Sequence, residues 1–285
     1  MIQLECTEVS DTEIYDACLD GVTDEGLKQR YQMIYPELSE AYDEYRNHAS
    51  LGALSDLPVL PNRTSDDEIV VGAINKGQLK ALYSAYLVPS AKPGRLFYDR
   101  LIVAGDRKCP SCGMGQVRTL DHYLPKSRYP KYSVLPANLI PSCRDCNTGK
   151  GASIAETAQE QVLHPFLDAD HFYQEQWLFA QVVWSNPLSI KYYVDAPAHW
   201  SETDRNRVKK HFDDYKLALR FSTEAGERLV ELLSQREILL RFGGPEACRE
   251  FLRESVEHYR NHVNDRRRAM YQALENAEGF WNPDV

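Results

Sequence analysis

Hydrophobic residues in the first hundred positions recur at helical spacing, with interruptions rich in proline and polar residues. Pro36 lies inside the first helical run and is expected to kink that helix or to split it in two. Residues 54–68 are rich in proline, aspartate and serine, which is typical of a loop. The pattern predicts a mostly helical N-terminal region over residues 1–100. Helical spacing covers three stretches: 24–48, 75–87 and 96–103.

The last part of the chain has a different pattern, with a strand-like stretch before further helices. Two short runs of β-like composition, WLFAQVVW and SIKYYV, flank the sequence SNP, and this arrangement predicts a hairpin. From 201 to 277 the spacing is helical almost throughout, with Ser201 at the expected start of the first helix. Residues 221–242 predict a second helix, which Gly243-Gly244-Pro245 separates from a third. We therefore expect residues 166–285 to form a short hairpin followed by helices.

The middle of the chain, from 109 to about 157, consists of turns, prolines and short apolar pairs. Such a segment needs a metal or neighbouring helices to form a core. It holds two CxxC pairs, CPSC and CRDC, which are Cys109 with Cys112 and Cys143 with Cys146. Four thiolates at about 2.3 Å complete a tetrahedral Zn²⁺ shell with no open position, so we predict a structural zinc site in preference to an iron–sulfur cluster. The other cysteines have no partner by spacing and are expected to be small buried hydrophobes: Cys6, Cys18 and Cys248.

Charge is distributed unevenly along the chain. The net charge is −9, but residues 101–151 carry eight basic and three acidic side chains, a local charge of +5 that leaves −14 for the remainder. This basic segment also contains Tyr123, Tyr129 and Tyr132. A basic, tyrosine-containing segment in an acidic protein suits nucleic-acid contact confined to one face, although charge alone favours a basic surface loop.

Three sequence motifs occur in order within residues 105–160: DHYLPKS, PANLIP and CRDCNTGKG. In this order and between the two CxxC pairs, they resemble the ββα-metal motif of the HNH nuclease family. The resemblance implies an α+β, mostly helical protein. In it, a zinc-clamped ββα-metal core over residues 101–165 is inserted between the helical N-terminal and C-terminal regions.

The resemblance also implies roles for individual residues. His122 would act as the general base that activates water, while Asp121 and Asn147 would hold a catalytic Mg²⁺ or Mn²⁺ through oxygen ligands. Asn147 stands where many family members have a histidine. Asn138 would support the site by bonding to backbone. Adjacent side chains on a strand point to opposite faces, so Asp121 and His122 would need an irregular strand end to reach one phosphate. Candidates for phosphate contacts are Lys126, Arg128 and Lys150.

Each of these residue types also has an ordinary structural interpretation. Without its flanking motifs, the Asp121-His122 pair would be read as a turn. His164 can extend a metal site, but a packed or capping role is favoured, as for His171, His199 and His211. Arg266-Arg267-Arg268 is expected to be a solvated face paired with acids. A core position is expected for the tryptophans: Trp177, Trp184, Trp200 and Trp281.

The resemblance implies a metal-dependent HNH endonuclease, with DNA favoured over RNA as its substrate. The alternatives are an RNA-cleaving, toxin-like HNH nuclease and a zinc-binding adaptor without catalysis. A second resemblance, to HNH proteins of bacterial anti-phage defence, implies a protein partner, for which the ATPase subunit of a Septu-type system is the candidate; an oligomer is the alternative way to present the substrate. The acidic N-terminus and the lack of a long apolar run favour a cytoplasmic protein without a membrane span.

Overall fold

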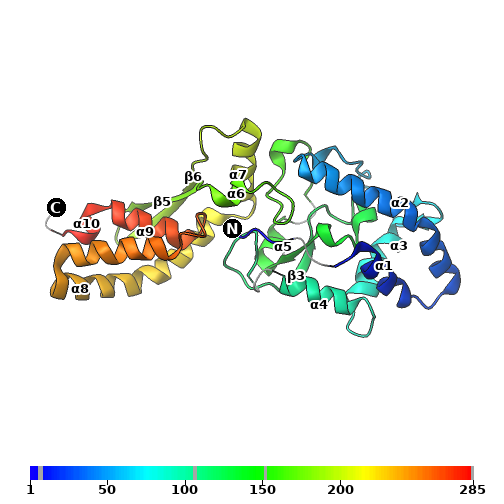
Figure 1. The fold of residues 1–285 in the computed structure, drawn as a ribbon, viewed down its shortest axis with the longest axis horizontal. Helices are drawn as coiled ribbons and strands as arrows, with labels where there is room; N and C mark the ends of the chain where they lie inside the picture. The colour runs from blue at the N-terminus through cyan, green and yellow to red at the C-terminus, as the bar shows by residue number, and fades with distance from the viewer. Residues whose placement is uncertain (6–8, 105–107, 151–152, 284–285) are drawn as a thin grey trace. The chain divides into compact units, whose positions relative to one another are not determined.

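The computed structural model describes residues 1–5, 9–104, 108–150 and 153–283, and for Lys150 its backbone alone. The chain divides into two compact units, one formed by Ile2–Asp168 and one by Ala169–Val285 together with Met1. Figure 1 shows helices in both units, and each unit also contains at least one short two-stranded sheet. The protein is therefore mostly helical and of the α+β class, as predicted.

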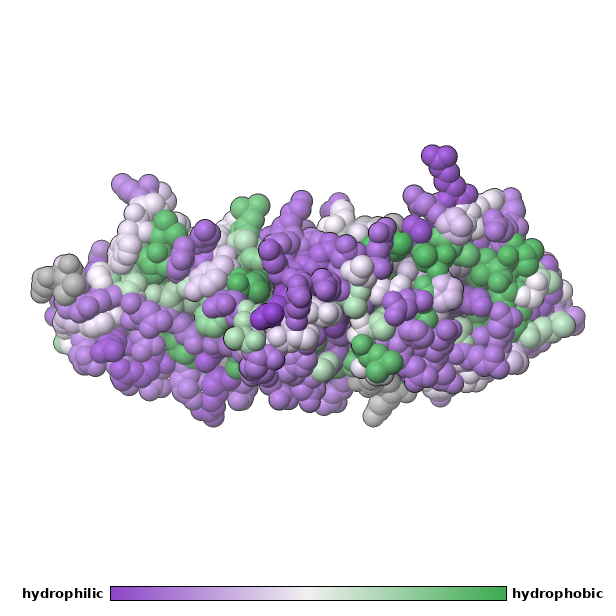
Figure 2. Space-filling model, turned by 90° about the horizontal axis from the view of Figure 1, so that it is seen from above, coloured by the Kyte–Doolittle hydropathy of each residue, from purple (hydrophilic) through white to green (hydrophobic). Residues whose placement is uncertain are grey.

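The surface of the protein is largely hydrophilic on the face that Figure 2 draws. Hydrophobic surface on this face is broken into separate areas. Within the described part of the chain, no helix is both long enough and apolar enough to cross a bilayer.

The first hundred residues of the first unit are mostly helical, as predicted. Their helices are α1 (Asp11–Asp20), α2 (Glu25–Ser50), α3 (Lys76–Ala81), the π-helical segment η2 (Leu82–Leu87) and α4 (Arg95–Val103). Of the two outcomes expected for Pro36, the structure has the single helix, because α2 continues through the proline. Tyr31 and Ile34 before the proline and Leu38 after it are all buried, so packing on both sides offsets the missing N–H group.

The polar stretch after α2 is irregular, as predicted, and ends in a small hairpin. It contains the 3₁₀ turn η1 (Leu54–Asp56) and leads into β1 (Ile69–Val71) and β2 (Ile74–Asn75). Gly72 turns this hairpin with a φ of 53°, and a β-carbon there would lie 2.7 Å from the Ile34 side chain. Asn75 then caps α3 through a reciprocal pair of bonds with Gln78.

A second antiparallel hairpin and a short helix form the centre of the first unit. Strand β3 (Thr119–His122) pairs with β4 (Leu139–Ser142), so that Asp121 faces Ile140 and His122 faces Leu139. Helix α5 (Arg144–Lys150) follows directly and packs against β3, and α4 contacts both strands. Two short 3₁₀ turns, η3 (Pro130–Tyr132) and η4 (Pro136–Asn138), connect the strands, and η5 (Ala158–Glu160) lies beyond α5.

The second unit is the expected hairpin covered by helices. Strand β5 (Leu178–Val183) pairs with β6 (Ser189–Val194). Helices α8 and α9 pack against these strands. Gly244 has φ 71° and ψ −173° within α8, so the glycine-glycine-proline sequence breaks this helix as predicted. The helices are α6 (His171–Gln174), α7 (Glu202–Asp214), α8 (Leu217–His258), α9 (Arg266–Asn276) and α10 (Glu278–Trp281).

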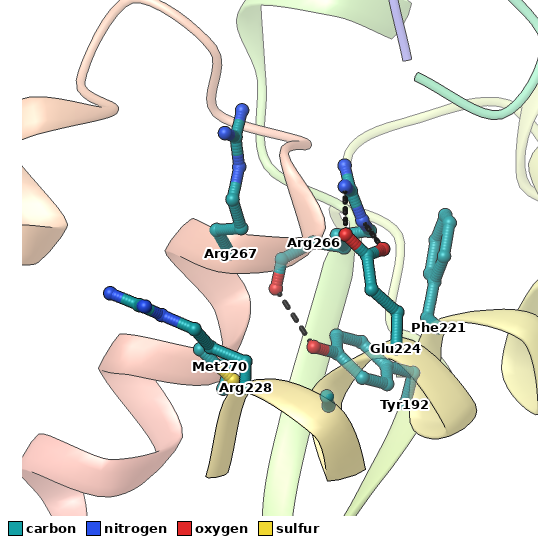
Figure 3. A pocket seen from close by; sticks show the side chains of 8 residues that line it. Tyr192, Phe221, Glu224, Arg228, Arg266, Arg267 and Met270 are labelled. Carbon is teal, nitrogen blue, oxygen red and sulfur yellow. Dashed lines mark hydrogen bonds and ion pairs between the residues drawn. The ribbon is translucent and has the colours of Figure 1, made fainter. Parts of the chain in front are cut away.

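Two of the three arginines at the start of α9 pair with acids, as expected, whereas Arg268 donates to the Gln176 side chain, and the triplet is half-buried and not a solvated face. In Figure 3 the Arg266 guanidinium contacts the Glu224 carboxylate, and the Tyr192 hydroxyl donates to the Arg266 carbonyl oxygen. Arg267 pairs with Asp265 at 2.8 Å. The cavity beside these residues has a volume of about 70 Å³, which is too small for a nucleotide.

The expectation that the tryptophans lie in the core holds only in part. Trp177 and Trp200 are buried, whereas Trp184, at the end of the hairpin, is 63% exposed. Trp281 is half-buried, and Trp184 follows β5 directly. Its apolar character therefore did not determine its burial.

The Asp265–Arg267 pair predicts a pH-dependent stability. Burial opposes ionisation of Asp265, but the hydrogen bond and charge of Arg267 outweigh it and hold the pKa at about 2. Because the folded pKa is depressed, the stabilisation is present at neutral pH and is lost as the pH falls from about 4 to about 2. We expect D265N, which keeps a capping oxygen at this position, to lower the free energy of unfolding by about 2 kcal/mol at pH 7 and by about half as much at pH 3. Urea unfolding at both pH values measures the difference, and an equal difference at the two values would contradict it.

Candidate metal centre and active site

The first cysteine pair lies on a tight turn closed by backbone bonds. The Cys109 N–H donates to the Gly115 carbonyl at 2.8 Å, and the Gly113 N–H donates to the Cys109 carbonyl at 2.8 Å. Gly113 has a φ of 67°, a conformation that favours glycine. The Gly115 N–H points at Cys112 Sγ at 3.4 Å. This turn therefore presents both sulfurs to one point and supplies a backbone donor to one of them.

The second cysteine pair meets the first at the beginning of α5. Cys143 precedes the helix and accepts the Asn147 N–H at 3.1 Å, while Cys146 lies within the first turn. A β-carbon on Gly115 would lie 2.7 Å from both Cβ and Sγ of Cys143. Only a glycine at 115 allows the two turns to approach this closely.

The four sulfurs have the spacing that a single zinc ion requires. All four cysteines are buried, and their Sγ atoms lie within 4.8 Å of one another. The distance between Cys112 Sγ and Cys143 Sγ is 3.9 Å, and a tetrahedron of sulfurs around zinc has edges of about 3.8 Å. The cluster predicted from the CxxC pairs can therefore hold a zinc ion.

Contacts between the four thiols shift their pKa values in opposite directions. Hydrogen bonds between the thiols lower the pKa of Cys112, and the bond from Cys109 lowers that of Cys143 to about 6. The same contacts raise the pKa of Cys109 and Cys146. Four buried thiolates would repel one another, and a divalent cation can take the place of the protons that keep two of them neutral.

His122 is the last residue of β3 and is held by a backbone carbonyl. Its side chain is 8% exposed, and Nε2 lies 2.9 Å from the Ser133 carbonyl oxygen. A carbonyl oxygen can only accept, so Nε2 carries a proton and Nδ1 is the acceptor nitrogen of the neutral ring. In this tautomer, Nδ1 is the nitrogen that can take a proton from water.

Asp121 and His122 point to opposite faces of β3, because burial alternates along this strand. The pairing of both Asp121 and His122 with β4 is regular, so the irregular strand end expected from the sequence does not begin before residue 122. Asp121 is half-buried. Burial raises the pKa of Tyr83, and the negative charge of Asp121 raises it further. Burial and the charge of Lys80 lower the pKa of Lys126, and the Asp121 carboxylate opposes this shift. Asp121 therefore belongs to the same neighbourhood as Tyr83 and Lys126.

Tyr83, from the N-terminal helices, is packed on this neighbourhood. Its hydroxyl donates to the Leu120 carbonyl of β3 at 2.8 Å. Its ring lies 4.5 Å from the His122 ring in an edge-on arrangement, and the Lys126 ammonium lies 4.2 Å from the ring centre. The π-helical segment η2 carries this residue, and such segments often occur at functional sites.

Asn138 is fully buried and supports the connection between the two strands. Its Oδ1 accepts the Leu124 N–H at 2.7 Å and the Tyr45 hydroxyl at 3.1 Å. Its Nδ2 donates to the carbonyls of Leu124 and Tyr132, both at 3.1 Å. Asn138 can therefore fix the loop that follows His122, but its burial keeps it from touching a substrate.

His164 takes part in the core beside Asn138. The Phe166 N–H donates to His164 Nδ1, so Nε2 donates to the Tyr45 hydroxyl at 3.1 Å. The ring also packs 4.4 Å from that of Tyr123. This is the packed role favoured from the sequence, and the ring nitrogens bond to protein atoms.

The remaining predicted site residues are placed differently from one another. Asn147 is half-buried on α5, the helix that packs against β3. Arg128 is engaged with the chain itself, because Nε donates to the Leu60 carbonyl at 2.6 Å and its own carbonyl accepts the Leu60 N–H at 3.0 Å. Cys18 and Cys248 are buried, as predicted. The Lys150 side chain and Cys6 lie outside the described residues.

Comparison with known proteins gives a relative that matches almost the whole chain. Protein Ea31 of Escherichia phage lambda is 34% identical over 286 aligned positions, which cover 95% of each chain. The chain belongs to the Ea31 family. The Septu protein PtuB of Bacillus thuringiensis is 32% identical to the present chain over 73 residues, which cover 24% of this chain and 28% of PtuB. No protein-family model and no solved structure matches.

Two tyrosines of this Ea31-family chain were not singled out by the sequence. Tyr83 contacts β3 and His122, and Tyr45 links Asn138 to His164. Both have apolar helical spacing, which predicts only that they face a core. Their hydroxyl partners lie 37 to 119 residues further along the chain, so no local pattern could identify them.

Proposed function

We propose that this chain is a metal-dependent HNH endonuclease that hydrolyses phosphodiester bonds, with DNA as the favoured substrate. The observation that carries the proposal is the tethered His122. Its Nε2 donates to the Ser133 carbonyl, which fixes the ring tautomer with Nδ1 as the acceptor nitrogen, and His122 ends a strand of the hairpin whose other strand leads directly into Cys143. A non-catalytic adaptor would not require a histidine held in one tautomer at this position.

The chain's own side chains supply the remaining chemistry. His122 takes the proton of the attacking water at Nδ1, and the Ser133 carbonyl stabilises the imidazolium that forms. Asp121 and Asn147 would offer oxygen ligands to Mg²⁺ or Mn²⁺, which when bound polarises the phosphoryl group and stabilises the leaving oxygen. Lys126 would bind a phosphate oxygen, and Lys150 is assigned the same role from the sequence pattern alone. Arg128 is better explained by its bonds to Leu60.

The same proposal includes a cellular context. The likeness to PtuB supports a role in anti-phage defence together with a protein partner, for which an ATPase subunit is the candidate. The acidic remainder of the chain supports a partner that presents the nucleic acid, because a net charge of −9 opposes tight binding of duplex DNA by the chain alone.

Cleavage assays test the proposed activity directly. The purified chain is incubated with supercoiled plasmid and, separately, with folded RNA, in Mg²⁺, Mn²⁺ or EDTA, with and without a co-purified partner. Conversion of plasmid that requires the metal is the expected result. Cleavage of RNA alone would replace the DNA substrate, and inertness toward both nucleic acids in the zinc-loaded protein with its partner would favour the adaptor.

Asp121→Asn is expected to weaken catalytic metal binding without removing an oxygen ligand. Loss of the negative charge should raise the Mn²⁺ concentration for half-maximal cleavage roughly tenfold, because affinity at such sites follows the number of charged ligands. The matched control is Asp99→Asn, which changes an exposed acid on α4, outside the proposed metal sites. Titration of Mn²⁺ measures the shift, and unchanged half-saturation in D121N would remove Asp121 from the metal site.

A further inference from the structure

We propose that Tyr83 is a positioning residue of the nuclease centre, which it completes from the N-terminal helices by holding His122 and Lys126 on one ring. This inference rests on the proposed nuclease function. The ring of Tyr83 lies edge-on to His122 at 4.5 Å and beneath the Lys126 ammonium at 4.2 Å. One buried side chain thus contacts both the residue proposed to activate water and the cation proposed to bind phosphate.

The Tyr83 ring is fixed relative to the strand that carries His122. Its hydroxyl donates to the Leu120 carbonyl at 2.8 Å, and Leu120 is two residues before His122 in β3. The side chain is 8% exposed. A ring anchored in this way cannot move without moving β3, so both of its partners keep a constant position relative to that strand.

Lys126 gains most from this arrangement. A lysine has four rotatable bonds, and ordering it on a phosphate costs conformational entropy. The electron-rich face of Tyr83 attracts the ammonium and restricts it before substrate binds. Asp121 acts electrostatically on the same ammonium, which places Lys126 next to the proposed metal ligand rather than at the edge of the basic segment. We therefore assign Lys126 to the scissile phosphate.

Steady-state cleavage by four variants separates positioning from folding. Y83F keeps the ring and should lower kcat less than about fivefold, whereas Y83M and K126M should each lower kcat roughly 100-fold with little change in KM. The double variant Y83M/K126M should be no slower than the slower single variant, because Lys126 without its ring is already misplaced. The matched control is Y98L: Tyr98 is 7% exposed and packs beside Tyr83, at 6.4 Å between ring centres.

Ring fluorination provides a measurement that is independent of side-chain size. Fluorinated phenylalanines at 83 weaken the attraction of the ring for a cation while nearly preserving its volume. We expect kcat to fall stepwise with each fluorine in the wild-type background and to stay constant in the K126M background. This series tests whether the ring at position 83 acts on Lys126, even if Y83M fails to fold.

The outcomes distinguish this inference from the function on which it rests. A wild-type chain that cleaves neither DNA nor RNA with its metals and partner overturns the proposed function and, with it, the role of Tyr83. Two results would overturn the role of Tyr83 alone, provided that the wild-type chain cleaves. One is a double variant in which the two defects multiply, and the other is a fluorine series that has no effect on kcat. A defect in Y98L equal to that in Y83M would likewise reduce Tyr83 to a core residue.

Discussion

Replacement of Cys146 by serine is expected to destabilise the first unit strongly and to abolish zinc binding. The hairpin strands β3 and β4 have four residues each and α5 has seven, so these elements cannot form a stable core alone. Structural zinc contributes an apparent binding free energy of about 10–16 kcal/mol in small zinc modules, and this becomes folding free energy. Loss of one sulfur ligand should therefore lower the unfolding temperature by roughly 10 °C or more.

Metal analysis and thermal unfolding measure this effect together. The wild-type chain should contain about one zinc ion, and a strong chelator should reproduce the instability of C146S. Cys248→Ser is the matched control, because Cys248 is also buried but lies in the second unit, away from the four-cysteine cluster. Wild-type protein that contains no zinc and keeps its unfolding temperature in chelator would contradict the prediction.

The effect of zinc loss should be confined to one part of the chain. Residues 169–285 have their own core, in which Trp177 and Phe221 are buried and Asn264 bonds to the backbone of residues 172, 175, 177 and 178. Limited proteolysis of the zinc-free chain should therefore cut within residues 109–150 and leave a protected C-terminal fragment.

Features determined by local chemistry were predictable from the sequence. The CxxC spacing located the cysteine cluster because each pair must form a tight turn to direct two sulfurs to one point. The hairpin at 178–194 and the break at Gly244 follow from strand composition and from the conformations that glycine and proline allow. These signals lie within a few residues of the structure that they specify.

Features determined by packing between distant segments were not predictable. Pro36 suggested a possible split, but the buried residues on both sides of it keep α2 continuous. Arg128 looked like a phosphate ligand because it is basic, whereas its guanidinium bonds to the carbonyl of Leu60, a residue 68 positions earlier. Sequence alone gives the charge of such a residue but not its partner.

The structure also changes the interpretation of the N-terminal helices, in which the sequence showed no catalytic residue. Tyr45 from α2 bonds to Asn138, and Tyr83 from η2 bonds to β3. Both hydroxyls therefore donate hydrogen bonds to the segment that carries the proposed nuclease residues. The helical region and this segment accordingly fall within one compact unit, Ile2–Asp168.

His122→Ala is expected to reduce cleavage roughly 10²–10⁴-fold, the usual contribution of a general base. Removal of the imidazole also leaves the Ser133 carbonyl without this donor. A loss of activity in H122A alone therefore does not distinguish a catalytic defect from a structural one. His122→Gln resolves this, because the glutamine Nε2 can donate to the same carbonyl but its side chain offers no basic nitrogen. Both variants should lose activity, while H122Q should keep the zinc content and unfolding temperature of the wild type.

Single-turnover cleavage of a labelled oligonucleotide measures the rate of the chemical step in the wild type, H122A and H122Q. Added imidazole should restore part of the activity of H122A, because the vacated space can admit a small base, and it should not restore H122Q, in which the side chain fills that space. The matched control is His48→Ala, since His48 lies at the end of α2 and bonds to the Glu44 carbonyl of its own helix. If H122Q cleaves at more than about a tenth of the wild-type rate, His122 is not the base, and its bond to Ser133 serves the fold alone.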